Sequence, residues 1–271
     1  PNFSKMGTIE VNLIRGLMSV IWQKYQARHG HLTRQQQRRI FQIMIIFIGL
    51  ILVILGLSFN FLRNTTRPSS RQYPVLGVSI SDADGYQDFH LLQQHGVQFV
   101  YLKATQGADY FSDRFLDNYW RIQGAQLAVG CYHYFSFSSS AVAQYNNFVG
   151  NVGARIGNLP IVLQINNYTD QRPSWTQINR RAKKLQYLLM RHYHRTVILQ
   201  VDPRDRALLQ NQSGGWLNCG PRPVHNLQLD FWQYDTRGKI PSLASTNRYH
   251  LSVFNGSQAD FNNFIGQSGT H

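Results

Sequence analysis

Acidic residues are scarce in this sequence, and glutamate is almost absent. The 271 residues include 13 Asp and Glu against 27 Lys and Arg, a formal net charge of +14, and Glu10 is the single glutamate. The two cysteines, Cys131 and Cys219, are too few for a disulfide framework or a zinc site, and they leave open one bridge or two free thiols. The sequence also lacks a phosphate-cradling loop, a metal cluster and a nucleophile triad. We therefore expect no metal and no cofactor.

The excess of positive charge is typical of proteins that meet a polyanion, such as nucleic acid, anionic lipid or an anionic wall polymer. The length suits one domain of about 200 residues plus an appendage, and a hydrophobic fraction of 43% is enough for a core. Much of the charge falls on a predicted basic helix. Its cations are Arg180, Arg181, Lys183, Lys184, Arg191 and the nearby Arg195. We interpret this helix as a solvated face that favours anionic wall polymers such as teichoic acids.

Residues 40–62 form an apolar run without a single charge, which is long enough to cross a bilayer. Arg38 and Arg39 precede it and fewer cations follow it, so we expect a single-pass transmembrane helix with a cytoplasmic amino terminus and an extracytoplasmic domain. The run is too long and begins too late for a cleaved signal peptide. Upstream, the basic segment 1–39 has apolar residues at helical spacing. This pattern fits an interfacial or partner-binding helix, or a short helix that merely precedes the membrane.

After a polar linker at 63–73, residues 74–267 alternate between strand and helix patterns. The expected strands are 75–80, 99–104, 128–135, 161–165, 197–201, 229–234 and 250–254, and the expected helices are 88–96, 115–127, 141–152 and 175–193. The alternation predicts βα units in a largely parallel sheet. No long helix pattern separates the last two strands, so the end of the sheet should depart from strict alternation.

The strand at 161–165 ends abruptly in polar residues. Gln164 and Asn166 lie two residues apart, so their side chains should share one face of the strand. In a barrel of strands and helices, polar side chains at the carboxyl end of a strand point into the site. A glycoside hydrolase places a pair of carboxylates at such an end, but here both residues are amides.

Motifs across the domain resemble those of the glycoside hydrolase family 25 lysozymes, the Chalaropsis-type muramidases. The matching segments, in the family order, are 77–81, 96–107, Tyr110 with Asp113, Phe115 and Asn118, then 128–135, 159–166, 232–234 and 251–256. The resemblance implies an α/β fold, a flattened (β/α) barrel of about five βα units plus closing strands. It also implies a groove for the peptidoglycan glycan at the carboxyl ends of the strands.

The sequence departs from the family where the family carries acids. Ser79 takes the Asp of the first strand, and Gln106 takes the Glu of Ala-Thr-Glu-Gly. Gln164 and Asn166 take the Asp-x-Glu whose Glu is the general acid, and His250 takes the Asp before Leu-Asn. An amide neither releases a proton nor carries charge, and general acid catalysis is worth about 10²–10⁴ in rate. We therefore expect no catalytic residues and interpret the domain as a pseudoenzyme.

The resemblance also suggests a groove that still binds glycan. Sugar rings stack on aromatic side chains, although any one of these rings fits a core position equally well. The candidate groove residues are Ser79, Gln106, Tyr132, Tyr134, Gln164, Asn166, Trp232, Tyr234 and His250.

Three functions remain open on the sequence. The first is a membrane-anchored pseudoenzyme that binds cell-wall glycan or scaffolds envelope proteins without cleaving peptidoglycan. The second is an active muramidase that uses displaced aspartates, for which the candidates are Asp82, Asp84, Asp202 and Asp230. The third is a protein–protein interaction subunit of a membrane complex. The expected partners are peptidoglycan or an anionic wall polymer, the membrane and other membrane proteins, but not nucleic acid.

Overall fold

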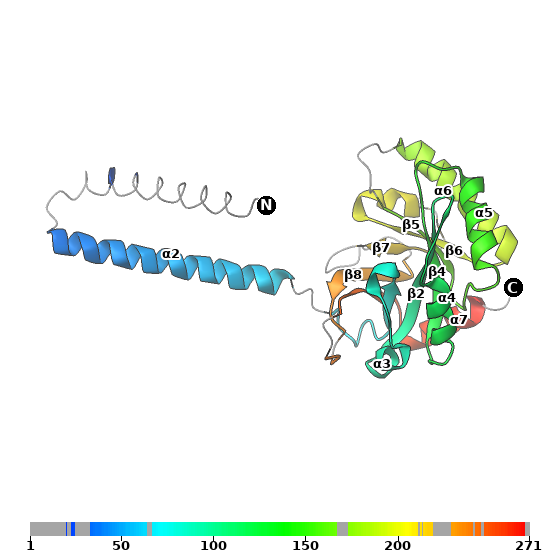
Figure 1. Cartoon of the computed structure of the whole chain (residues 1–271), viewed down its shortest axis with the longest axis horizontal. Helices are drawn as coiled ribbons and strands as arrows, with labels where there is room; N and C mark the ends of the chain where they lie inside the picture. Colours follow the sequence, from blue (N-terminus) through cyan, green and yellow to red (C-terminus); the bar gives the residue numbers. More distant parts are fainter. Residues whose placement is uncertain are drawn as a thin grey trace. The chain divides into compact units, whose positions relative to one another are not determined.

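A computed structural model of the protein describes residues 20, 23–24, 33–63, 67–166, 173–210, 212, 214–218, 229–240, 242–244 and 247–268. The chain divides into two compact units, residues 1–63 and 64–271 (Figure 1). Most of the predicted basic segment, and Cys219 with its predicted pairing, lie outside the described residues.

The first unit contains the long helix α2, Arg34–Arg63, which includes the apolar run at 40–62. Thr33 caps it, since its Oγ1 accepts the Gln36 N–H at 3.4 Å and Gln36 Oε1 accepts the Thr33 N–H at 3.0 Å. Large apolar side chains such as Ile46 and Phe47 are exposed. The stretch Arg34–Ile54 is long and apolar enough to cross a membrane, as the helix of a membrane anchor or a signal sequence would be.

The second unit is a barrel of eight strands with helices around it, as the resemblance implies (Figure 1). The strands are β1 (Leu76–Ile80), β2 (Val97–Gln106), β4 (Ala128–Tyr134), β5 (Ile161–Ile165), β6 (Val197–Val201), β7 (Trp216–Asn218), β8 (Phe231–Gly238) and β9 (Tyr249–Phe254). They follow one another in the order β1-β9-β8-β7-β6-β5-β4-β2, and pairing of β1 with β2 closes the barrel. Neighbours are parallel except at β9, which is antiparallel to both β8 and β1.

Helices cover the outside of the barrel and one end of it. They are α3 (Phe89–Gln94), α4 (Phe115–Ile122), α5 (Ala141–Val152), α6 (Trp175–Tyr193) and α7 (Gln258–Ser268), with the 3-10 helices η1 (Asp82–Asp84) and η2 (Pro203–Leu209). In α6, Ile178, Ala182, Leu185 and Leu189 recur at helical spacing and are buried, while the basic residues lie between them. Ser174 Oγ caps this helix by accepting the Gln177 N–H.

The barrel interior is filled mainly by aromatic rings, which form a core cluster separate from the one between strands and helices. Two glycines make room for these rings. A Cβ at Gly77 would lie 2.2 Å from the Phe99 ring, and a Cβ at Gly130 would lie 2.4 Å from the Tyr101 ring. Phe261 of α7 packs on Phe99 near the start of β2, so α7 covers the amino-terminal end of the barrel.

The predicted parallel sheet and the irregular end at the last two strands are confirmed. The prediction missed β7, the two-residue β3 (Tyr110–Phe111) that pairs with the end of β2, and α7. β3 and β7 are too short to show a strand period. The predicted helix at 115–127 ends earlier, at Ile122, and β2 extends beyond the predicted 99–104 at both ends.

Candidate functional site

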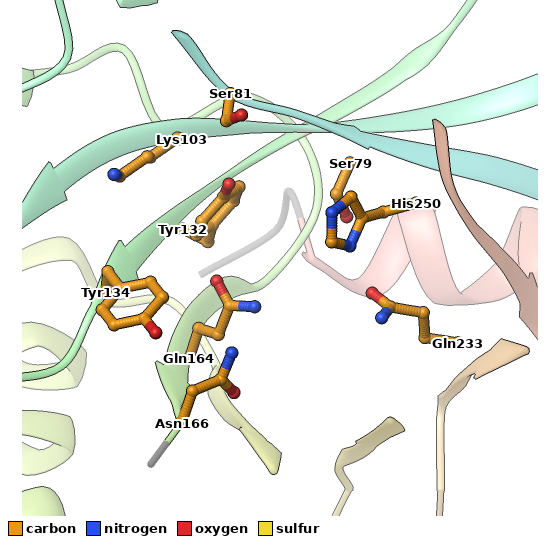
Figure 2. A pocket seen from close by; sticks show the side chains of 9 residues that line it. All are labelled: Ser79, Ser81, Lys103, Tyr132, Tyr134, Gln164, Asn166, Gln233 and His250. Carbon is orange, nitrogen blue, oxygen red and sulfur yellow. The ribbon is translucent and has the colours of Figure 1, made fainter. Parts of the chain in front are cut away.

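A cavity of about 200 Å³ opens at the carboxyl ends of the parallel strands (Figure 2). Nine side chains line it: Ser79, Ser81, Lys103, Tyr132, Tyr134, Gln164, Asn166, Gln233 and His250. They come from β1, β2, β4, β5, β8 and β9 or from the residue just beyond a strand. The location is the one at which βα barrels build their sites.

The antiparallel direction of β9 brings His250 to this end of the barrel. Because β9 runs against β1, its first residues lie beside the last residues of β1, and His250 is the register partner of Ser79. On the other side, Tyr134 is the register partner of Gln164. Six of the nine predicted groove residues therefore line one cavity: Ser79, Tyr132, Tyr134, Gln164, Asn166 and His250.

The other three predicted residues do not line the cavity. Gln106 lies next to it and accepts a hydrogen bond from Lys103 Nζ at 2.8 Å. Trp232 and Tyr234 lie on the outer face of β8, where the Trp232 ring packs 5.4 Å from the ring of Tyr73. Gln233, between them, points inward (Figure 2). We therefore no longer assign Trp232 and Tyr234 to the groove.

Sequence reasoning missed Ser81, Lys103 and Gln233, although strand alternation would have found two of them. Ser81 follows Ser79 by two residues. In β2, Lys103 follows Tyr101 by two residues and so continues the odd-numbered series, of which Phe99 and Tyr101 face the barrel interior. Gln233 would have required knowing which face of β8 is inside. Both faces of that strand carry large apolar residues, so the pattern leaves this open.

None of the nine described lining residues is a carboxylate, and Lys103 is the one lysine or arginine among them. The Lys103 ammonium lies over two aromatic rings, 4.8 Å from the centroid of Tyr110 and 5.7 Å from that of Tyr134. Burial lowers its pKa, and the negative charge of Asp82 opposes that effect.

Loss of water also shifts the pKa values of two other lining groups, in each case in the direction that favours the neutral form. It raises the pKa of the Tyr132 phenol, and the charges of Asp84 and Asp82 add to the effect. At the rim, His250 has an exposed side chain, yet the surrounding protein displaces enough water to lower its pKa. Asp84 and Asp235 counteract this partly. At neutral pH the imidazole is therefore uncharged.

A network of amides lies beside Gln233. Gln200 Nε2 donates to Asn218 Oδ1 at 2.8 Å and to Gln233 Oε1 at 3.3 Å. Asn218 Nδ2 in turn donates to Asp202 Oδ1 at 3.2 Å. The bond from Gln200 fixes the orientation of the Gln233 amide. The Asp202 carboxylate accepts the bond from Asn218, and it also lies 3.9 Å from the Arg204 guanidinium.

Asp82 is held as an ionised anchor rather than as a proton donor. Its carboxylate accepts hydrogen bonds from Ser112 Oγ at 2.6 Å, Tyr110 Oη at 2.8 Å and the Arg114 N–H at 3.1 Å. Burial alone would raise its pKa, but these bonds and the charge of Lys103 outweigh burial and lower it. A general acid needs the opposite shift.

Asp84 and Asp230 differ in their distance from the cavity. Asp84 Oδ2 accepts hydrogen bonds from the backbone N–H of Ser81 at 2.7 Å and from Ser81 Oγ at 2.9 Å, so it lies directly behind a lining residue. Burial raises the pKa of Asp230 to about 7. However, Asp230 precedes β8 and therefore lies at the amino-terminal end of the barrel, opposite the cavity.

Two polar atoms of the lining have no hydrogen-bond partner among the residues that the structure describes. They are the Oγ of Ser79, a side chain with 8% exposure, and the Oδ1 of Asn166. Such atoms are costly when buried and are free to bond a ligand. Among the described residues, no group of three His, Cys, Asp or Glu side chains is placed to hold a metal ion.

The family model for glycosyl hydrolases family 25 matches residues 78–243, which is more than half of the chain. The chain belongs to this family. Among curated proteins, it is 25% identical to YegX of Escherichia coli O6:H1 over 208 residues, covering 71% of this chain and 74% of YegX. It is 35% identical to lysozyme M1 of Streptomyces globisporus over 80 residues, covering 29% of this chain and 27% of the lysozyme.

Solved structures of family 25 proteins have the same fold. A family 25 glycosyl hydrolase from Bacillus anthracis matches with a TM-score of 0.67 at 25% identity, covering 74% of this chain and 97% of that one. A bacterial lysozyme from Streptomyces coelicolor matches with a TM-score of 0.62 at 24% identity, covering 72% and 98%. These matches confirm the predicted lysozyme-like barrel.

Proposed function

We propose that this family 25 domain is a pseudoenzyme that binds the glycan of peptidoglycan without cleaving it, at the outer side of a membrane in which α2 anchors it. The observation that carries the proposal is the cavity lining, because none of the nine lining residues that the structure describes is Asp or Glu. Glycoside cleavage needs a carboxylic acid at the leaving oxygen and a second carboxylate near the sugar. Ser79, Gln164, Asn166 and His250 offer neither.

Binding is supported by the same residues. Amides and hydroxyls hydrogen-bond to N-acetyl and hydroxyl groups of sugars, and the half-buried Tyr134 offers a ring face. Neutral groups in place of acids also relieve repulsion toward anionic wall polymers. Since a small groove buries few contacts, we expect affinities between about micromolar and millimolar.

The decisive experiment is a glycan-release assay on the full chain in an uncharged detergent. We expect no new reducing ends from peptidoglycan at any pH from about 4 to 8, the range in which aspartate and histidine titrate. Lysozyme M1 serves as the positive control. In a parallel sedimentation assay, insoluble peptidoglycan should retain the protein, and Asn166→Ala should reduce retention. Tyr187→Ala, a change to an exposed ring on α6, should not.

The position of Asp84 favours one second candidate, a muramidase that uses a displaced acid. Asp84 lies behind Ser81, and its charge reaches both Tyr132 and His250. Under this alternative, hydrolysis would be measurable in the wild-type protein and lost in Asp84→Asn or Asp82→Asn. Such a result would overturn the pseudoenzyme proposal.

A further inference from the structure

The charge of the cavity is inverted relative to what a carboxylate-based site would have. As far as the structure describes the lining, it contains one lysine, one histidine and no acid. We propose that the cavity is an anion-binding site, in which the Lys103 ammonium holds a carboxylate or phosphate group carried by the ligand. The inference rests on the proposed function, because it names the class of glycan that the cavity takes.

No carboxylate in the described part of the chain contacts Lys103 directly. Its direct contacts in the described part of the chain are the side-chain amide oxygen Oε1 of Gln106 and the rings of Tyr110 and Tyr134, all of them neutral groups. The nearest acid in electrostatic terms is Asp82, whose oxygens are engaged by other donors. A half-buried cation with neutral contacts gains most from an anion that brings both charge and acceptor oxygens.

The surrounding groups suit an oxyanion on a sugar. Figure 2 shows Lys103 and Tyr134 on one side of the cavity, Gln164 and Asn166 beneath, and Ser79, His250 and Gln233 on the other side. The amide N–H groups of Gln164 and Asn166 add donors, and the buried Ser79 Oγ has no hydrogen-bond partner in the described part of the protein. Thus the cation lies at one side, and neutral donors and a ring face lie where a sugar would extend.

The acids closest to the cavity do not cancel this preference. Asp82 and Asp84 both lie in η1, where Ser112, Tyr110 and Ser81 donate hydrogen bonds to their carboxylates. The surrounding protein displaces water from His250 and lowers its pKa, so the imidazole adds no positive charge beside Lys103 at neutral pH. Neither carboxylate is among the nine described lining residues, where Lys103 is the one lysine or arginine.

Three probes test the inference on the full chain in an uncharged detergent, by calorimetric titration at pH 7. They are a neutral N-acetylglucosamine trimer, an oligosaccharide of alternating N-acetylglucosamine and N-acetylmuramic acid with free carboxylates, and a glycerol-phosphate oligomer. We expect the carboxylate sugar to bind about tenfold tighter than the neutral trimer, the gain typical of one charge-assisted hydrogen bond. Comparing the carboxylate sugar with the phosphate oligomer tells which source of anion the cavity accepts.

Variants at and away from the cavity assign the effect to Lys103. Lys103→Gln should remove the preference, so that the carboxylate sugar and the neutral trimer bind with equal affinity, and Lys103→Arg should retain it. Gln106→Glu should also remove it, because it gives Lys103 a carboxylate partner. Lys183→Gln is the matched control, since it removes the same charge from α6 and leaves the cavity unchanged. Thermal unfolding identifies any variant that fails to fold, in which case Gln106→Glu carries the test.

The outcomes separate the two proposals. Equal affinity of the wild type for charged and neutral sugars overturns the anion site and leaves glycan binding intact. A preference that survives Lys103→Gln but falls in Lys183→Gln assigns it to the protein surface and also overturns the anion site. Lys103-dependent binding of the phosphate oligomer without any sugar binding supports the anion site and overturns the glycan proposal.

Discussion

Ser79 on β1 and His250 on β9 are direct register partners, and both side chains enter the same cavity (Figure 2). The two residues are 171 positions apart in the sequence, and the antiparallel direction of β9 brings them together. The resemblance to family 25 places an aspartate at each position. One strand pair therefore holds two of the four cavity positions at which the resemblance places an acid.

Restoring the acids should restore chemistry. We expect the combined variant Ser79→Asp, Gln164→Asp, Asn166→Glu and His250→Asp to release reducing ends from peptidoglycan. The rate should exceed that of the wild type by about 10² or more, which is the lower range for general acid catalysis. The control carries the same changes except at Asn166. A folded combined variant without activity would show that the missing acids are not the whole defect.

The stability of the barrel should depend on the protonation of His133. This buried side chain bonds to Thr105 Oγ1 and Gln144 Oε1, and burial lowers its pKa from 6.5 to about 4, against the opposing effect of the Gln144 bond. Between these values the unfolded chain binds a proton that the folded protein does not. Stability should therefore fall by up to about 3 kcal/mol as pH drops from 6.5 to 4.

Denaturant unfolding at several pH values checks this dependence by comparing the wild type with His133→Gln. The difference in pH slope between them is the contribution of His133. An exposed histidine, His90, gives the matched control His90→Gln, which should keep the wild-type slope. Equal slopes in His133→Gln and the wild type would contradict the assignment.

Asp230 should act in the opposite direction over an overlapping range. Burial raises its pKa from 3.8 to about 7, so between these values the folded protein binds a proton that the unfolded chain does not. The contribution of Asp230 to stability is therefore present at acid pH and lost as pH rises through 7. We expect Asp230→Asn to stabilise the protein by up to about 4 kcal/mol at pH 8, and by little at pH 4.

The same unfolding series measures this effect. Because Asp230 and His133 oppose each other, the wild type should show a shallower pH slope than either variant. Asp202→Asn is the control, since Asp202 lies at the cavity end and is partly exposed. If Asp230→Asn shifted stability equally at pH 4 and pH 8, the effect would come from packing and not from titration.

Two glycines should respond to alanine with opposite signs. Gly130→Ala places a Cβ 2.4 Å from the buried Tyr101 ring, and such overpacking costs about 1–3 kcal/mol. Gly150→Ala in α5 meets nothing within 4 Å and should stabilise the helix by about 0.5–1 kcal/mol. Melting temperatures should move by about 2–4 °C per kcal/mol in a protein of this size.

The orientation of the chain in the membrane is a further prediction. Arg38 and Arg39 precede the apolar part of α2, so the barrel should be extracytoplasmic. Protease added to intact, wall-stripped cells should digest the barrel, and a cytosolic marker should survive in the same sample. Digestion that requires lysis would reverse the orientation. Release of the protein by alkaline carbonate would argue against an anchor altogether.

The shared face of residues at the end of a strand could be predicted from the sequence, because side chains two positions apart in a strand point the same way. Gln164 and Asn166 were assigned to one face by strand alternation, and both line the cavity. Trp232 and Tyr234 were assigned by the resemblance alone. The phase of β8 places Phe231 and Gln233 inside instead, and a strand that is apolar on both faces does not reveal its phase.

The position of Asp230 could not be predicted for a related reason. A residue next to a short strand is close to one end of the barrel, and the sequence does not say which end until the strand direction and bounds are known. The amide bonds that join Gln200 to Asn218 and Gln233 also stayed hidden, because β7 is three residues long and leaves no pattern.

The closure of the barrel has a consequence for biosynthesis. β1 is bonded to β2 early in the chain, but its other edge pairs with β9, the last of the eight barrel strands in chain order. Until residue 254 has emerged, β1 and β8 each have an open edge, and the cavity lacks the wall that carries His250. The cavity is therefore completed only after β9 has been translated, and β9 is the segment at which a folding helper or a quality-control protease would meet the unfinished protein.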